Sequence, residues 1–112
     1  MKDLNIVFNN CQFAVTVCDL ECIIIYMNEK AQRVFQKYGD LIGKNLRDCH
    51  SEPSIGKIDE LLKTGSENTY TIEKNGIKKI IHQTPWFNGG EIAGLIELSI
   101  EIPLEMPHFV RS

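Results

Sequence analysis

The sequence contains no long hydrophobic run, and this absence limits the kinds of protein it can be. Its longest stretch without charged or strongly polar residues is Cys22–Met27, far shorter than the ~20 apolar residues of a membrane-spanning helix. The opening residues, MKDLNIVFNN, lack the apolar stretch and cleavage site of a signal peptide. We therefore expect a cytoplasmic protein, outside the membrane, whose four cysteines are reduced thiols.

Basic charge is also scarce. The 12 Lys and Arg residues are outnumbered by 15 Asp and Glu residues, and the formal net charge is -3. This balance argues against a nucleic acid as a direct partner, because phosphate binding requires a basic surface. Linkers, repeats and low-complexity segments are missing as well. The 112 residues, 43% hydrophobic and 24% charged, predict one globular domain.

The first half of the chain predicts a hairpin followed by short helices. Residues 1–12 are expected to form a short helix or an arm. Two β-branched runs, 13–19 and 22–28, are typical of paired strands. Asn28 is then a candidate helix N-cap. A longer helix is expected to begin near Ser51 or Ser54 and to end at Gly65, because Pro53 fits only a first turn.

The second half of the chain predicts three strands joined by tight turns. Residues 68–74 lead to Asn75-Gly76, a strong signal for a two-residue hairpin turn. Residues 77–87 and 91–102 follow, and the alternation of Ile96 and Leu98 with Glu97 is typical of a half-buried strand. The chain is therefore expected to form an α+β domain over 13–102, a five-stranded antiparallel sheet with short helices covering one face. Residues 103–112 form a tail.

Four segments carry a resemblance to a known family. They are FAVTVCD, IIIYMNEKAQRVFQKY, GDLIGKNLRD and TPWFNGGEIAGLIELSIEI, in this order. Together they resemble the PAS domain family. The resemblance implies a sheet with 13–19 and 91–102 at its centre, and a cavity between sheet and helices. It also implies a non-enzymatic sensory or protein-interaction domain that binds a small ligand or a partner in signal transduction, for example in the regulation of transcription.

The sequence departs from the family pattern at the end of the last strand. Many PAS domains have an Asp-Ile-Thr step there, which leads into a signalling helix, whereas this chain has Glu101-Ile102-Pro103. Proline does not favour an uninterrupted helix. A signal is therefore expected to pass to a separate signalling protein or through a homodimer.

The pair Cys49-His50 is the main candidate for chemistry. An enzyme using it is one alternative, although no triad, carboxylate pair or phosphate loop accompanies it. A haem-binding gas or redox sensor using His50 or His82 is another, but the helix that carries the axial histidine in haem-binding relatives has no histidine here. Flavin chemistry is disfavoured because Leu46 stands where light-sensing relatives place the reactive cysteine. A zinc site at Cys18, Cys22, Cys49 and His50 lacks a C-x-x-C pair, so we predict no cofactor and no metal.

Two surfaces are predicted from apolar positions. The cavity is expected to take a small apolar or aromatic ligand, and its wall is predicted to contain Val15, Val17, Val34, Phe35, Ile42, Leu46, Cys49, His50, Ile58, Leu62 and Ile81. A dimer or partner face is predicted to contain Ile80, Trp86, Leu95 and Ile96. The apolar tail residues Leu104, Met106, Phe109 and Val110 are expected to pack on their own sheet or on a second copy.

Overall fold

The structure, a computed structural model, describes residues 4–50 and 52–112, without the side chain of Cys49. The elements are α1 (Leu4–Asn9), β1 (Ala14–Asp19), β2 (Ile24–Met27), α2 (Glu29–Val34), the 3-10 helices η1 (Gln36–Tyr38) and η2 (Leu46–Cys49), α3 (Ser54–Thr64), β3 (Asn68–Lys74), β4 (Ile77–Asn88) and β5 (Glu91–Ile102). No helix among these residues has the length and apolarity needed to cross a bilayer.

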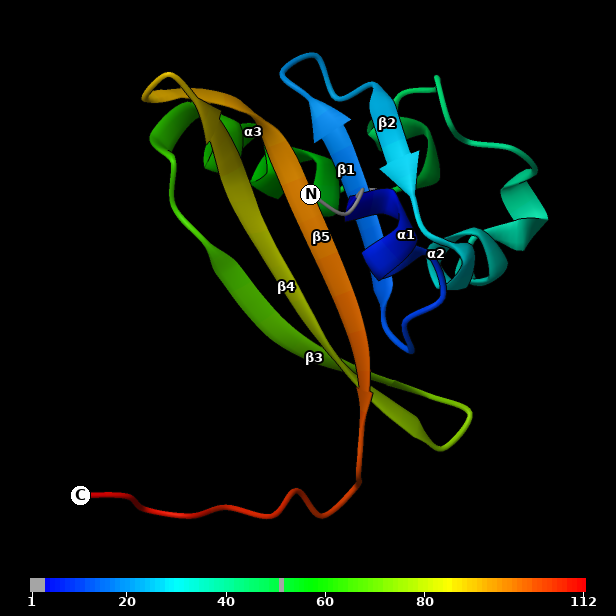
Figure 1. The fold of residues 1–112 in the computed structure, drawn as a ribbon, viewed down its shortest axis with the longest axis vertical. Coiled ribbons are helices and arrows are strands. Elements are labelled where there is room, and N and C mark those ends of the chain that lie inside the picture. Colours follow the sequence, from blue (N-terminus) through cyan, green and yellow to red (C-terminus); the bar gives the residue numbers. More distant parts are fainter. Residues whose placement is uncertain (1–3, 51) are drawn as a thin grey trace.

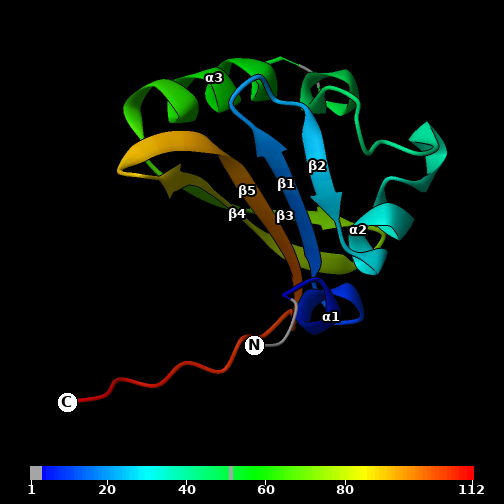
Figure 2. The ribbon, with the colours of Figure 1, turned by 45° about the horizontal axis from the view of Figure 1, so that its top comes forward.

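The five strands form one antiparallel sheet in the order β2-β1-β5-β4-β3. This confirms the predicted α+β class and the central position of β1 and β5. Helix α3 covers one face of the sheet, while α1 lies near the start of β1 on the other side (Figures 1 and 2). The face toward α3, which carries Thr16, Leu95 and Glu97, is called the inner face. The outer face carries Val17, Ile96 and Leu98.

Asn28 ties three elements together at the start of α2. Its Oδ1 accepts hydrogen bonds from the backbone N–H of Ala31, at 3.0 Å, and of Val15, at 2.9 Å. Its Nδ2 donates to the carbonyl oxygens of Phe8 and Phe13. The predicted N-cap is therefore confirmed, and the same fully buried side chain also holds α1 and β1 in place.

Local turn chemistry explains how the strands are connected. Asn75 and Gly76 have φ values of 54° and 77°, as the two central residues of a type I′ turn require. Gly94 has a different role in β5, since a Cβ there would overlap the carbonyl oxygen of Cys18. The indole of Trp86 reaches across this position and donates to the same oxygen at 3.0 Å. The close contact of β5 with β1 therefore depends on Gly94.

The hydrophobic core lies between the inner face and the helices. Helix α3 contributes Ile58 and Leu61, which have no exposed surface, and Phe35 and Leu62 pack against the core from its edge. The sheet, the shorter helices and the connecting segments contribute Ala14, Cys18, Cys22, Ile24, Met27, Ala31, Leu41, Leu46 and Leu95. The core closes the centre of the inner face, and an open pocket lies toward β3 and β4 on the α3 side.

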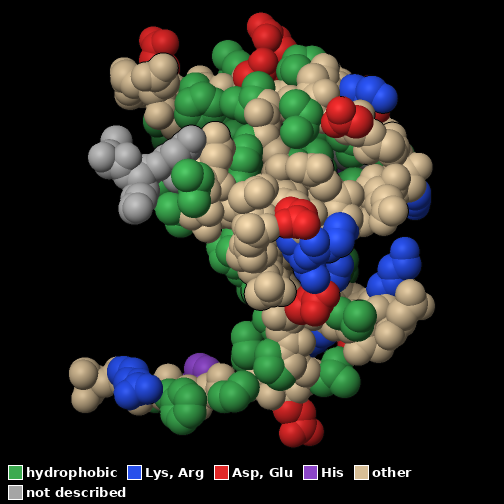
Figure 3. Space-filling model, turned by 45° about the vertical axis from the view of Figure 1, so that its right-hand side comes forward, with side chains coloured by type: hydrophobic (Ala, Val, Ile, Leu, Met, Phe, Trp, Pro, Cys, Tyr) green, Lys and Arg blue, Asp and Glu red, His purple; other side chains and the backbone are tan. Residues whose placement is uncertain are grey.

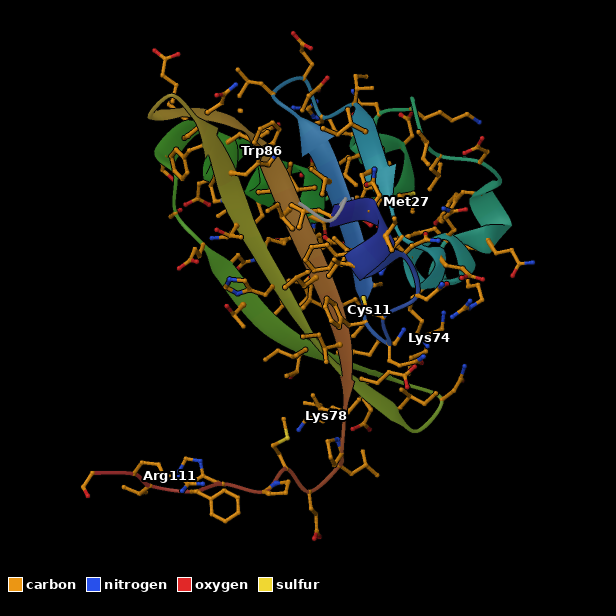
Figure 4. All side chains as sticks on the ribbon, in the orientation of Figure 1. Cys11, Met27, Lys74, Lys78, Trp86 and Arg111 are labelled. Carbon is orange, nitrogen blue, oxygen red and sulfur yellow. The ribbon has the colours of Figure 1, made fainter. Side chains whose placement is uncertain are left out.

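The tail extends away from the domain. Leu104, Met106, Phe109 and Val110 are each more than half exposed, and hydrophobic side chains line the tail where it leaves the body (Figure 3). Arg111 lies well away from Trp86 and the rest of the sheet (Figure 4). The expectation that the tail packs back on its own sheet is therefore wrong for this structure, because no part of 103–112 is buried.

Candidate functional site

A row of polar side chains crosses the inner face at right angles to the strands. Asn68 on β3 pairs with Gln83 on β4, Gln83 pairs with Glu97 on β5, and Glu97 pairs with Thr16 on β1. Direct cross-strand partners project to the same face of a sheet. These four residues, the polar row, therefore lie side by side, and Thr16, Gln83 and Glu97 are only 3%, 3% and 8% exposed.

Hydrogen bonds run along the polar row in one direction. Asn68 Nδ2 donates to Gln83 Oε1 at 3.0 Å, and Gln83 Nε2 donates to Glu97 Oε2 at 2.8 Å. If the Gln83 amide were turned around, its oxygen would face the Glu97 carboxylate, and two acceptors would meet without a proton between them. Glu97 therefore fixes the orientation of Gln83, and Gln83 provides the buried carboxylate with the donor that it needs.

His50 reaches the same carboxylate from the segment between η2 and α3. Its Nδ1 lies 3.0 Å from the carbonyl oxygen of Leu46, and its Nε2 lies 3.6 Å from Glu97 Oε2. Since a carbonyl oxygen can only accept, the Nδ1 proton points to Leu46. Protonation of Nε2 would then complete an ion pair with Glu97. Both ring nitrogens thus already face oxygen atoms, and a haem-ligand role for His50 would require these contacts to break.

An open pocket of about 660 Å³ lies beside the polar row. Asn68 and Gln83 form part of its wall, with Tyr70 next to them on β3 and Gly56 on α3. Burial, with a smaller effect from the charge of Glu97, raises the pKa of the Tyr70 phenol, so this group stays a neutral O–H donor at physiological pH. The described lining consists of Glu52, Pro53, Ser54, Gly56, Lys57, Glu60, Asn68, Tyr70 and Gln83.

Several residues predicted to line the cavity lie elsewhere. The strand register places Val15 and Val17 on the outer face, and Val34 is 39% exposed on α2. Val15 and Val17 were predicted wrongly because α3 covers the alternate residues of β1, and Val34 because it lies at the exposed end of α2. Ile42 is 46% exposed and lines a second pocket, of about 620 Å³, beside α2.

Other predicted cavity residues pack into the core or approach the polar row. Leu46 and Ile58 are buried in the core, and Phe35 and Leu62 pack against it. Ile81 is 6% exposed on the inner face, one pair along from the polar row. Their contact with a ligand stays a prediction. The side chain of Cys49 lies outside the described residues, so its predicted place in the cavity wall stays a prediction.

Three of the four residues predicted for the partner face lie on the outer face, and their contact with a partner stays a prediction. The strand register places Ile80 and Ile96 on the outer face. Trp86 lies on the same face, where its side chain crosses Gly94. Leu95 is an exception, because it pairs with Cys18 on the inner face and is only 1% exposed in the core. The assignment of Leu95 to the partner face is therefore wrong.

Two cysteines of the core are chemically protected. Cys18 and Cys22 have no exposed surface. Burial raises the pKa of the Cys18 thiol from 9.0 to about 12, and it also raises the pKa of Cys22. Reactive thiolates are consequently rare at both positions near neutral pH. Among the described side chains, no three potential metal ligands come together.

Comparison with known proteins gives consistent results. The model of a family described as PAS domain matches residues 12–100. The PAS domain of histidine kinase ThkA superposes with a TM-score of 0.65 and 18% identity, covering 79% of this chain and 97% of that one. A sensory box sensor histidine kinase from Vibrio cholerae superposes with a TM-score of 0.66 and 16% identity, covering 90% of both chains.

A third similar structure is described as VqmA bound to DPO. It has a TM-score of 0.67 and 19% identity, and the match covers 92% of this chain and 60% of that chain. At these identities the similarity shows the fold alone. The search of curated protein sequences produced no match.

Proposed function

The chain belongs to the PAS domain family, whose members are sensory modules of signal transduction, and on this premise we propose that it senses a small ligand bound beside the polar row. The ligand lies between α3 and strands β3 and β4. The domain performs no catalysis of its own. Binding alters the contacts of Gln83 with Glu97, and through Glu97 those of His50 in the segment before α3.

The observation that carries this proposal is the position of the polar row at the wall of a ligand-sized pocket. The volume of about 660 Å³ falls within the ~300–1,000 Å³ typical of small-molecule sites. Such sites combine an enclosing wall with a few placed polar groups, here the amides of Asn68 and Gln83. The mixed lining favours a polar ligand over the apolar one predicted from the sequence. That VqmA is described as bound to DPO is in keeping with ligand binding by this fold.

The signal is proposed to leave through the outer face to a second copy of the chain. Ile96, Leu98 and Ile100 are half-buried there, and the apolar residues of the tail are exposed. An isologous pair would let each tail cover the outer face of its partner, because the same two surfaces occur on both copies. Regulation of transcription or of another protein would follow from this assembly.

A substitution on α3 tests the ligand pocket. A Cβ at Gly56 would have only Glu52 Oε2, at 3.4 Å, as a close neighbour, so Gly56→Phe should fill the pocket without a backbone clash. Gly56→Ala is the matched control, since it also replaces the helix glycine with a better helix former but leaves the pocket open. After mild purification, native mass spectrometry should find a small ligand on the wild type and Gly56→Ala, but not on Gly56→Phe.

Two results would overturn the proposal. One is a wild-type protein that carries no ligand and whose amide resonances do not move when a concentrated extract of small metabolites is added. The other is a ligand that remains bound in Gly56→Phe. A Soret or flavin band in the absorption spectrum would instead identify the ligand as one of the two cofactors considered from the sequence.

A further inference from the structure

The amides of Asn68 and Gln83 retain hydrogen-bonding capacity on the pocket side. A side-chain amide has two N–H donors and an oxygen with two lone pairs. Within the described residues, Asn68 uses one donor for Gln83, and Gln83 uses one lone pair for Asn68 and one donor for Glu97. Each amide therefore keeps both a donor and a lone pair, and a bound molecule must supply partners of both kinds.

The charged groups around the pocket are already paired or acidic. Lys57 Nζ lies 3.3 Å from Glu60 Oε2, and Glu97 has Gln83 and His50 as neighbours. Glu52 adds a further carboxylate to the wall. Lys57 is the one cation among the described lining residues, and carboxylates of the wall outnumber it. A neutral ligand, whose binding needs no charged partner, fits this wall best.

The shape of the wall next to the amides favours a flat ligand. Tyr70 is two residues from Asn68 on β3, so both side chains project to the inner face. Its ring and the ring of Pro53 both line the pocket. Ring faces of this kind pack well against planar groups.

From these features we propose that the pocket recognises a neutral, planar ligand carrying a hydrogen-bond donor beside an acceptor, as in a carboxamide or a lactam. Asn68 and Gln83 form hydrogen bonds with the donor and the acceptor of the ligand. Glu97 holds the Gln83 amide in the orientation that these hydrogen bonds require. The inference rests on the proposed function, because it names the ligand class of the same pocket.

Three probes of nearly equal shape test this ligand class on the full chain. Benzamide has the donor and the acceptor, acetophenone has only the acceptor, and benzoate is an anion without a donor. Titration of the ¹⁵N-labelled protein should give a dissociation constant for benzamide at least about tenfold lower than for the other two, since one hydrogen bond is lost in each. The side-chain amides of Asn68 and Gln83 should shift most. Equal affinities or a preference for benzoate would overturn the inference.

Variants assign the preference to the amides. Gln83→Met keeps the length of the side chain and removes both hydrogen-bonding groups, so it should weaken benzamide binding about tenfold and remove most of its advantage over acetophenone. Thr84→Val is the matched control, since the next residue of β4 projects to the outer face. Asn68→Val provides a second, less buried variant if Gln83→Met does not fold. An unchanged preference for benzamide in a folded variant at either position would contradict the proposed role.

The outcomes separate this inference from the proposed function. If a ligand co-purifies and is lost in Gly56→Phe, but benzamide has no advantage over acetophenone, the pocket is a ligand site and the amide-edge inference fails. If no ligand co-purifies and no probe binds, both fail. A co-purified ligand identified by mass as an anion would also overturn the amide-edge inference.

Discussion

The two faces of the sheet differ in where polar side chains are buried, although the hydrophobic core also lies against the inner face. The inner face, which α3 covers, carries the polar row, with Gln83 3% and Glu97 8% exposed. The outer face carries Ile96, Leu98 and Ile100, which are only half-buried. Buried faces are usually apolar, and exposed faces polar. The buried polar row and the half-buried apolar side chains depart from this pattern, which is why we propose ligand recognition at the inner face and partner contact at the outer face.

Mutual hydrogen bonding explains why a polar inner face is compatible with stability. A buried carboxylate without partners would cost several kcal/mol. Glu97 avoids this through the 2.8 Å hydrogen bond from Gln83 and its contact with His50. On the outer face, Thr69 and His82 share a hydrogen bond across β3 and β4, but the apolar side chains of β5 gain only from coverage by another surface. The two faces should therefore respond differently to the same kind of substitution.

The largest effect is expected where the outer face and β1 meet. Gly94→Ala would force β5 away from the Cys18 carbonyl and displace the Trp86 indole. Overpacking against backbone should lower the free energy of unfolding by about 3 kcal/mol. Chemical denaturation measures this loss. Gly56→Ala, whose added methyl meets only the Glu52 side chain at an ordinary contact distance of 3.4 Å, is the control, and equal stability of the two variants would contradict the described packing.

A double-mutant cycle should detect the coupling within the polar row. Gln83→Leu leaves the buried Glu97 without its donor, and we expect a loss of about 2–3 kcal/mol in the free energy of unfolding. Glu97→Leu should cost about 1–2 kcal/mol, because an amide donor then loses its acceptor. The double variant should be no less stable than Gln83→Leu alone, a coupling of about 1–2 kcal/mol. Additive losses in urea unfolding would mean that the two side chains do not interact.

Alkaline pH should weaken the core beneath the inner face. The folded state raises the pKa of Cys18 from 9.0 to about 12, so it holds this proton where the unfolded chain releases it. Stability should therefore fall as pH rises through this range, and the raised pKa of Tyr70 acts in the same direction. Cys18→Ala should flatten the decline between pH 9 and 12. A wild-type stability that is constant over this range would disprove the assignment.

The same burial should appear in thiol labelling at neutral pH. Cys18 and Cys22 have no exposed surface, whereas Cys11 is partly exposed. Iodoacetamide should modify Cys11 in the folded protein and reach the other two only after unfolding. Peptide mapping by mass spectrometry measures the order of reaction, and early modification of Cys18 would show that the core is open.

The smallest effect on stability is expected for the tail. Removal of residues 103–112 should change the free energy of unfolding of the monomer by less than about 0.5 kcal/mol, because these residues are exposed. Sedimentation should nevertheless show weaker self-association at micromolar concentration. If the full and the shortened chain both sediment as monomers, the tail and the outer face do not form the proposed dimer.

Much of the fold could be predicted because its signals are local. Asn28 caps a helix through its own side chain, and Asn75-Gly76 adopts left-handed φ values that few other residue pairs tolerate. The strand order followed from the family resemblance and is confirmed by the pairing. These features depend on a few neighbouring residues and are therefore visible in the sequence.

The assignment of faces could not be predicted in the same way. Ile96, Leu98 and Ile100 alternate with Glu97, as residues that face a core would, yet α3 and the core lie on the side of Glu97. The two-residue turn at Asn75-Gly76 fixes Asn68 opposite Gln83. The pairing of these two members of the polar row could therefore be worked out from the sequence. The register shift between Trp86 and Phe87 moves the pairing of β4 with β5 by one residue. The partner of Glu97 on β4 therefore cannot be found by counting residues from the turn.

The most direct test of the account compares the ¹H–¹⁵N spectra of the protein as purified and after removal of its ligand. The side-chain amides of Asn68 and Gln83 should shift strongly. Those of Gln32 and Gln36, which line the second pocket beside α2, should stay in place. Largest shifts at Gln32 and Gln36, or on the outer face, would contradict the claim that the polar row is the ligand-recognition site.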